Sequence, residues 1–259
     1  MRRFFAGDIP SRPAGWPAGP AGWKEDVQCA EVRGDEFRHL KNVLRLGPGD
    51  EVTLFNGRGL EFEGKIESIG RDFARVRIER ETVCRRESPI NVVLLQGLVK
   101  GGKPELIVQK AVELGVNGII FYTAERAVPK FDKERAEKKA ERLMKVAIGA
   151  LKQCGRAMLP EIGFRAGFNE AVGGWEDFLK IALYEGEKTR RIKDVLKAGV
   201  RKDGIVIIVG PEGGLSDAEV AEARKRGFMP VSLGPRILRA ETAAIAAMGI
   251  LQYELGDMG

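Results

Sequence analysis

The chain has 259 residues, of which 44% are hydrophobic and 31% charged, so we expect a folded protein with one large or two modest domains. The formal net charge of +6 is compatible with a nucleic-acid partner but does not require one, since many enzymes carry a similar charge. Three well-separated cysteines argue against a disulfide framework or a cysteine-ligated zinc site. No apolar run is long enough for a signal peptide at the N-terminus or for the roughly 18 residues of a membrane span, so we expect a cytoplasmic protein that does not enter a membrane.

The N-terminal third has the pattern of a small β-rich domain. Residues 10–23 contain four prolines, which exclude a helix or a central strand, so this stretch is predicted to be an exposed loop. The dipeptide Asn56-Gly57 is a strong hairpin signal between alternating runs. The predicted strands are Glu51–Phe55, Leu60–Ile69 and Phe73–Ile78. Together these features predict a barrel over residues 1–80, followed by a charge-rich linker at Arg80–Ser88.

From Ile90 onward short apolar runs alternate with helical patterns. The predicted strands are Ile90–Leu95, Gly118–Tyr122, Lys180–Tyr184, Ile205–Val209 and Pro230–Leu233. The predicted helices are Pro104–Leu114, a helix capped by Asp132, and Glu241–Tyr253. Strands that alternate with helices in this way indicate a parallel α/β sheet.

A glycine-rich turn, Gly210–Gly214, follows the predicted strand Ile205–Val209. Ser216 and Glu219 have the spacing of a capping box, which fixes the start of the next helix. Ligands of open α/β sheets bind at the carboxyl ends of the strands, and glycines let the backbone approach a ligand closely. We therefore favour a binding turn over a plain connection, for which one glycine would suffice. The sequence fits neither the dinucleotide-binding pattern nor the P-loop.

A second glycine turn opens the segment Gly234–Thr242, in which Ile237 and Leu238 stand between Arg236 and Arg239. An apolar pair between two arginines suits a pocket with an apolar floor for an adenine ring and charged walls. In the alternative interpretation, the apolar pair belongs to the core and the arginines are simply solvated. The segment alone does not distinguish these two possibilities.

Taken together, the two glycine motifs resemble the SPOUT superfamily of knotted methyltransferases. More narrowly, they resemble the family that methylates N3 of a uridine in 16S ribosomal RNA, often called the RsmE family. Further matching segments are Arg3-Phe4-Phe5, His39–Arg45 with Gly49-Asp50, Gln96–Lys100, Ile107–Lys110, Glu113–Val116, and Gln153 with Arg156. The chain departs from the family pattern in its long stretch at residues 10–23 and at Cys154, where a small hydroxyl residue is expected. These departures concern RNA contacts rather than the reaction.

The resemblance implies a fold and a cofactor. The expected fold is a PUA-like, RNA-binding β-barrel at residues 1–80 and an α/β SPOUT domain at residues 89–259 that contains a deep trefoil knot. Pattern alone would not predict a knot, because knots are nearly absent from proteins. The expected cofactor is S-adenosyl-L-methionine, held by three turns of a homodimeric enzyme. The implied cofactor-binding residues are Leu183, Tyr184, Glu185, Gly210, Pro211, Glu212, Gly213, Gly214, Leu233, Gly234, Ile237, Leu238, Arg239, Thr242 and Ala243.

The chemistry of the implied reaction suggests catalytic roles. The sulfonium donor is already electrophilic, so we expect no metal requirement. The uridine N3 must lose its proton, and Arg239 and Arg236 are candidates to stabilise the resulting anion. Glu241 or Glu212 could accept the proton, although a carboxylate at the start of a helix is also favoured by the helix dipole alone. His39 lies far along the chain from the donor motifs, so we assign it to RNA binding or structure.

Basic residues on both domains are candidates for contact with 16S ribosomal RNA or the small ribosomal subunit. They are Arg2, Arg3, His39, Lys41, Arg45, Lys100, Lys103, Lys110 and Arg156. Lysines on helix faces are often merely solvated, so we expect only some of these residues to touch RNA. Two other functions remain open on sequence alone, namely methylation of a ribose 2′-hydroxyl and a non-catalytic role in RNA binding or ribosome assembly.

Overall fold

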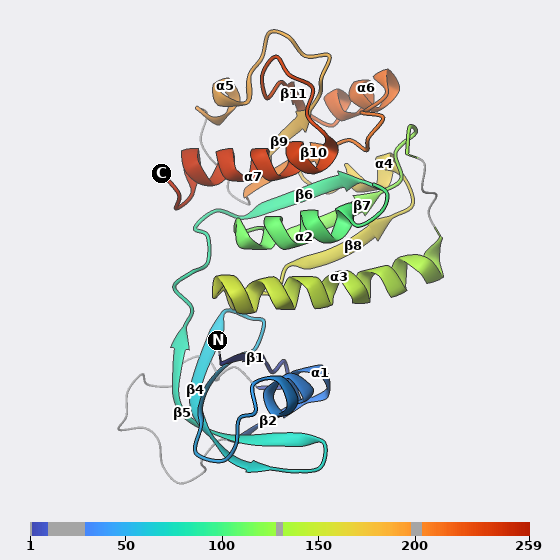
Figure 1. Ribbon diagram of the computed structural model, residues 1–259. Helices are drawn as coiled ribbons and strands as arrows, with labels where there is room; N and C mark the ends of the chain where they lie inside the picture. Colours follow the sequence, from blue (N-terminus) through green and yellow to red (C-terminus); the bar gives the residue numbers. More distant parts are fainter. Residues whose placement is uncertain (1, 10–28, 128–131, 198–203) are drawn as a thin grey trace. The chain divides into compact units, whose positions relative to one another are not determined.

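The computed structural model describes residues 2–9, 29–127, 132–197 and 204–259, so the predicted loop at residues 10–23 lies outside the described residues. The chain divides into two compact units (Figure 1). One comprises Met1–Glu87 with Leu151–Leu159, and the other Ser88–Ala150 with Pro160–Gly259. The return of residues 151–159 to the N-terminal unit is not part of the sequence-based expectation, which ends that domain at residue 80.

The N-terminal unit contains a five-stranded sheet with the strand order β1-β3-β4-β5-β2. Its strands are β1 (Arg3–Phe5), β2 (Cys29–Arg33), β3 (Glu51–Phe55), β4 (Leu60–Ile69) and β5 (Phe73–Val83). β3 and β4 pair antiparallel with Phe55 opposite Glu61, which confirms the hairpin. Alternate side chains of these strands, including Leu54, Phe62 and Val76, form a buried core.

The predicted linker at Arg80–Ser88 is wrong at its start, because β5 continues to Val83. This part of β5 pairs with β4, with Glu63 opposite Arg80 and Leu60 opposite Val83. The Arg80 guanidinium donates two hydrogen bonds to the Glu63 carboxylate, at 2.7 and 2.9 Å. Cross-strand pairs of opposite charge stabilise antiparallel strands, so a charge-rich segment can extend a strand instead of ending it.

Two short helical turns follow β2, an α-helix α1 (Gly34–Arg38) and a π-helical turn (His39–Val43). The Leu44 N–H donates to the His39 carbonyl at 3.0 Å, the five-residue spacing of a π-turn. Arg45 then has a φ of +52°, the left-handed region that side chains other than glycine rarely adopt. The segment His39–Arg45 that resembles the family is therefore an irregular helical turn ending in an unusual backbone conformation.

The C-terminal unit is built on a six-stranded, all-parallel sheet with the strand order β11-β9-β10-β6-β7-β8. Its strands are β6 (Val92–Gly97), β7 (Gly118–Tyr122), β8 (Glu161–Arg165), β9 (Phe178–Leu183), β10 (Gly204–Val209) and β11 (Met229–Val231). Every residue of β6, β7 and β10 is buried, as expected for strands covered on both faces. The predicted α/β fold with a parallel sheet is confirmed; the trefoil knot stays a prediction.

Helices connect these strands and cover the sheet. They are α2 (Lys103–Glu113), α3 (Lys133–Cys154), α4 (Phe168–Ala171), α5 (Ile192–Leu196), α6 (Asp217–Lys225) and α7 (Ala240–Leu255). α2 and α7 pack side by side (Figure 1). Because all strands are parallel, the segments that follow β9, β10 and β11 emerge at the same edge of the sheet. Within the described residues, no helix is both long enough and apolar enough to cross a membrane.

Candidate active site

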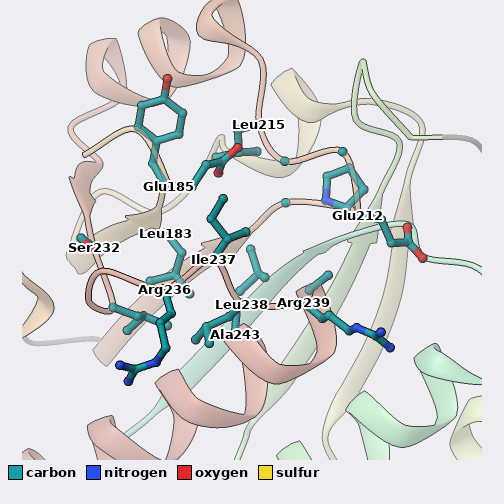
Figure 2. A pocket seen from close by; sticks show the side chains of 18 of the residues that line it. Leu183, Glu185, Glu212, Leu215, Ser232, Arg236, Ile237, Leu238, Arg239 and Ala243 are labelled. Carbon is teal, nitrogen blue, oxygen red and sulfur yellow. The ribbon is translucent and has the colours of Figure 1, made fainter. Parts of the chain in front are cut away.

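Three segments at the carboxyl edge of the sheet line one cavity of about 480 Å³ (Figure 2). The first segment ends β9, the second follows β10, and the third runs from β11 into α7. The lining residues are Leu183, Tyr184 and Glu185; Val209 to Leu215; Val231 to Gly234; Arg236 to Ala240; Ala243; and Lys103 of α2. All implied cofactor-binding residues line the cavity except Thr242, which is exposed on α7.

The turn Gly210–Gly214 is closed by a hydrogen bond from the Gly214 N–H to the Pro211 carbonyl at 3.0 Å. Gly214 has a φ of +69°, and a Cβ atom at this position would overlap the Glu185 carboxylate. The backbone conformation therefore favours glycine here, and any larger residue would also displace the Glu185 carboxylate.

The predicted capping box at the start of α6 is confirmed. The Glu219 N–H donates to Ser216 Oγ at 3.2 Å, and the Ser216 N–H donates to the Glu219 carboxylate at 2.9 Å. The second oxygen of Glu219 accepts a hydrogen bond from the Glu125 N–H at 2.9 Å. The cap thus fixes both the exit of the glycine turn and the loop that follows β7.

The third lining segment begins at Ser232, whose Oγ accepts a hydrogen bond from the Gly234 N–H at 3.1 Å. Gly234 has a φ of +124°, and no atom of the described residues lies within 4 Å of the position that a Cβ would take. Ile237 is 87% exposed, so the interpretation that places it in the core is wrong. Leu238 is half-buried. An exposed isoleucine at the rim of a cavity is instead available to a bound ligand.

Lys103, Glu212 and Glu241 form a charged cluster at one end of the cavity. Lys103 Nζ lies 2.8 Å from Glu212 Oε1 and 3.7 Å from Glu241 Oε2. The Lys100 N–H also donates to Glu212 Oε1, at 3.1 Å. Arg239 is close enough to act electrostatically on Lys103. We refer to Lys103, Glu212 and Glu241 below as the Lys103 cluster.

The two carboxylates of the cluster differ in their suitability as a base. Burial raises the pKa of Glu212, but hydrogen bonds from the Lys103 side chain and the Lys100 backbone outweigh it, so the net pKa is lowered. A carboxylate with a lowered pKa is a weaker proton acceptor. Glu241 does not itself line the cavity, but its Oε2 atom is buried without a hydrogen-bond partner among the described residues. Glu212 thus lines the cavity but is a weakened proton acceptor, whereas Glu241 keeps a carboxylate oxygen without a hydrogen bond but does not line the cavity.

The two arginines proposed for catalysis do not point to the same place. Figure 2 shows the guanidinium groups of Arg236 and Arg239 directed away from each other, with Glu212 on the Arg239 side. Both side chains belong to exposed residues that line the cavity. The Arg239 guanidinium therefore lies on the Glu212 side of the cavity, and the Arg236 guanidinium points away from it.

The expected RNA-contact residues fall into three groups. Arg2, Lys41, Arg45 and Lys100 are exposed, and His39, Lys103 and Lys110 are half-buried. Arg3 and Arg156 are each only 3% exposed, so their assignment to direct RNA contact is corrected. Arg3 pairs with Glu61, and Arg156 Nε lies 2.8 Å from the Glu87 carboxylate. Both guanidinium groups form buried ion pairs within the N-terminal unit. The sequence shows the charge of these arginines but not their partners.

Replacing Arg3 by methionine is expected to lower the free energy of unfolding by about 3 kcal/mol, measured by urea denaturation. Arg3 also donates to the Arg156 carbonyl at 2.7 Å and lies over the Phe55 ring, so its loss removes several contacts at once. Arg86 remains 3.5 Å from Glu61, which places the cost at the lower end for a broken buried pair.

The neighbouring Arg2→Met variant is the matched control, because the Arg2–Asp50 pair at 2.9 Å is exposed. Its cost is expected to stay below about 1 kcal/mol. Equal costs for the two variants would show that the burial of Arg3 adds nothing to stability.

Comparison with known proteins supports the family resemblance that the glycine motifs indicate. A model of an RNA methyltransferase domain matches residues 86–252, and a model of an RNA methyltransferase PUA domain matches residues 32–79. The chain is 33% identical over 235 residues to ribosomal RNA small subunit methyltransferase E of Bacillus subtilis (strain 168), covering 89% of this chain and 92% of that protein. The chain belongs to the ribosomal RNA small subunit methyltransferase E family. The family resemblance stated from the motifs is thereby confirmed.

Two solved structures match over the full length of this family member. The methyltransferase E from Neisseria gonorrhoeae, bound to S-adenosyl methionine, has 30% sequence identity and a TM-score of 0.84 and covers 100% of both chains. A methyltransferase from Legionella pneumophila, in complex with bound SAM, has 34% identity and a TM-score of 0.86 and covers 100% of this chain and 99% of that one. The PUA-like and α/β parts of the predicted fold are confirmed.

Sequence reasoning missed part of the cavity. Lys103 is assigned there only to RNA binding, although it lines the cavity. The other lining residues missed are Val209, Leu215, Val231, Ser232 and Ala240. Val209 and Val231 end β10 and β11, Ala240 begins α7, and Leu215 lies between the glycine turn and α6. The available signal is their position directly beside the glycine motifs.

Proposed function

We propose that this chain catalyses S-adenosyl-L-methionine-dependent methylation of N3 of a uridine in 16S ribosomal RNA of the small subunit. The observation that carries the proposal is the cavity formed by the three turns after β9, β10 and β11, with the Lys103 cluster and Arg239 at one end. Membership of the ribosomal RNA small subunit methyltransferase E family supports the substrate class.

The cavity fits S-adenosyl-L-methionine in size and in chemistry. A volume of about 480 Å³ lies within the range of pockets for small molecules. Leucine, isoleucine and valine side chains supply apolar walls for a purine ring, and Glu185 supplies a carboxylate for a cationic ligand. Gly234 leaves open space beside the backbone. The cofactor supplies an electrophilic methyl group on a sulfonium; the leading candidates to hold it are Leu183, Glu185, Gly210–Gly214, Gly234 and Leu238.

The chain itself must make the uridine N3 nucleophilic. N3 carries a proton, so the site has to remove that proton and stabilise the anion that remains. Arg239 supplies positive charge at the end of the cavity where the Lys103 cluster lies. Oε2 of Glu241 forms no hydrogen bond among the described residues and lies 3.7 Å from Lys103 Nζ. Glu241 is the proposed proton acceptor and Arg239 the proposed source of anion stabilisation. Arg236 is retained as a cavity residue without a defined catalytic step.

Replacing Glu241 by glutamine is expected to lower kcat by about 10²-fold, because the neutral amide cannot accept the N3 proton. Affinity for the cofactor, measured by calorimetry, is expected to stay within about a factor of two, since Glu241 does not line the cavity. The residual rate is expected to rise with pH as hydroxide replaces the carboxylate. Unchanged kcat in the Gln variant would remove Glu241 from the mechanism.

The proposed reaction is tested with purified protein, S-adenosyl-L-methionine and unmodified small-subunit RNA or assembled subunits. Digestion to nucleosides and mass spectrometry should detect N3-methyluridine. A 2′-O-methylated nucleoside instead would favour a ribose methyltransferase. A chain that binds no cofactor in calorimetry would favour a non-catalytic RNA-binding protein, so the two alternatives are separated by product and by binding.

We also propose that the enzyme acts as a homodimer in the cytoplasm and contacts RNA through its exposed basic residues. The α7 face that carries Ala243 and Ala246 is only partly covered within the chain, which leaves surface for a second copy. Arg2, Lys41, Arg45 and Lys100 are the exposed candidates for RNA contact. Phosphate neutralisation by such residues predicts weaker RNA binding at higher salt. The target base must be unpaired or flipped to present N3.

A further inference from the structure

Lys103 occupies a position that helix stability alone does not explain. It is the first residue of α2, directly after the N-cap Gly102. The helix dipole disfavours a cation at this end and favours an anion, a role that Glu105 in the same first turn already fills. A lysine here interacts unfavourably with the helix dipole, so the contacts of its side chain with other segments must account for its position.

The side chain of Lys103 reaches two other segments of the same unit. Its ammonium donates to Glu212 in the turn after β10 at 2.8 Å and lies 3.7 Å from Glu241 at the start of α7. The hydrogen bond with Glu212 raises the pKa of Lys103 above its usual 10.5, and the pKa of Glu212 is lowered below 4.5. Both groups therefore remain charged throughout the pH range in which RNA methylation can be assayed.

The ammonium retains capacity for a further partner. An ammonium group carries three donors, and the hydrogen bond to Glu212 uses one of them. The side chain of Lys103 is 31% exposed and lines the cavity. Glu212 thus anchors the ammonium at the cavity wall without closing it off from a bound ligand.

We propose that Lys103 is a catalytic residue of this methyltransferase, whose ammonium contacts a carbonyl oxygen of the target uridine and stabilises the N3 anion. The inference rests on the proposed function and assigns Lys103 a role different from phosphate contact. The N3–H bond breaks and its proton passes to the Glu241 carboxylate. The electron pair left on N3 is shared with the two adjacent carbonyl oxygens, where the ammonium acts. N3 then uses this pair to bond the methyl group, whose former bonding pair stays on the sulfur of the donor.

The arrangement of charges favours Lys103 over Arg236 for this role. Arg236 points away from Arg239 and Glu212 (Figure 2), whereas Lys103 is bonded directly to Glu212. Arg239 and Lys103 are near enough for mutual repulsion, which Glu212 and Glu241 offset. An anion that forms at this end of the cavity would therefore lie near two cations, of which Lys103 is already held by its hydrogen bond to Glu212.

The test compares Lys103→Met with the wild type and with Lys225→Met, in which the removed lysine also pairs with a glutamate but lies on α6 away from the cavity. The Lys103 variant is expected to lose about 10²-fold in kcat while keeping its affinity for S-adenosyl-L-methionine. Its rate is expected to continue rising to higher pH than that of the wild type, because the anion forms less readily. Lys103→Arg should recover most of the activity, and Lys225→Met should behave as the wild type.

A second readout uses small-subunit RNA transcribed with 5-fluorouridine and assembled into subunits. Fluorine makes N3 more acidic, so stabilisation of the anion matters less with this substrate. The ratio of the wild-type kcat to the Lys103→Met kcat should therefore fall by at least about tenfold. If Lys103→Met lowered kcat by the same factor at every pH and with both substrates, the catalytic role would be overturned. Lys103 would then only hold Glu212 in place through their ion pair. A wild type that binds cofactor yet forms no N3-methyluridine would overturn the proposed function and this inference together.

Discussion

Replacing Arg239 by alanine is expected to lower kcat by about 10²–10³-fold, the range found when one charge-stabilising donor is removed from an active site. Arg239 lines the cavity from the N-cap position of α7, where its side chain makes no capping hydrogen bond. Truncation should therefore cost little stability. The measurement is single-turnover methylation of small subunits with cofactor in excess, with cofactor affinity determined separately by calorimetry.

Two variants frame this result. Arg226→Ala removes an arginine that pairs with Glu222 at 2.9 Å on α6, outside the cavity, and should leave kcat unchanged. Arg236→Ala should cost less than Arg239→Ala, because the two side chains point in different directions. Full activity of the Arg239 variant would refute its role in stabilising the anion. A loss confined to cofactor affinity would assign Arg239 to binding alone.

Replacing Gly214 by valine is expected to weaken cofactor binding by about 10³-fold, which corresponds to about 4 kcal/mol. The backbone φ of +69° is strongly unfavourable for a β-branched residue, and the new side chain would collide with Glu185. The Glu185 carboxylate would have to move away from Gly214, which changes the wall of the cavity. Calorimetry with S-adenosyl-L-methionine measures the effect directly.

Gly174→Val is the matched control for backbone strain. Gly174 has a φ of +82° in the same unit, but no atom in the described part of the chain lies within 4 Å of its Cβ position and it does not line the cavity. This variant should lose stability without losing cofactor affinity. If both variants bound the cofactor as the wild type does, the contact between the turn and Glu185 would not shape the binding site.

The cavity could be located from the sequence because its turns carry local signals. Each glycine motif follows a short apolar run, and parallel strands bring the segments that follow them to one edge. The capping residues Ser216 and Glu219 also fix the start of α6 through contacts only three residues apart. Local signals of this kind can be recognised in the sequence without knowledge of the rest of the fold.

The parts that could not be predicted depend on partners that are distant in sequence. Lys103 meets Glu212 across 109 positions, so nothing near Lys103 indicates that it lines the cavity. In the sequence, Arg3 and Arg156 resemble surface cations, because the partners that allow their burial, Glu61 and Glu87, are distant in sequence. β8 is missed because this edge strand has no fully buried residue and no continuous apolar run.

The division of the chain into units has a consequence for how the protein is made. The N-terminal unit includes Leu151–Leu159, which the ribosome synthesises only after more than sixty residues of the other unit. Those late residues contribute Lys152, whose ammonium lies 3.0 Å from Glu36, and the Arg156 carbonyl that accepts from Arg3. The N-terminal unit therefore leaves the ribosome first but lacks part of its structure until Leu151–Leu159 has been synthesised. We therefore expect its folding during translation to finish only after Leu159 has been synthesised, five residues beyond the end of α3.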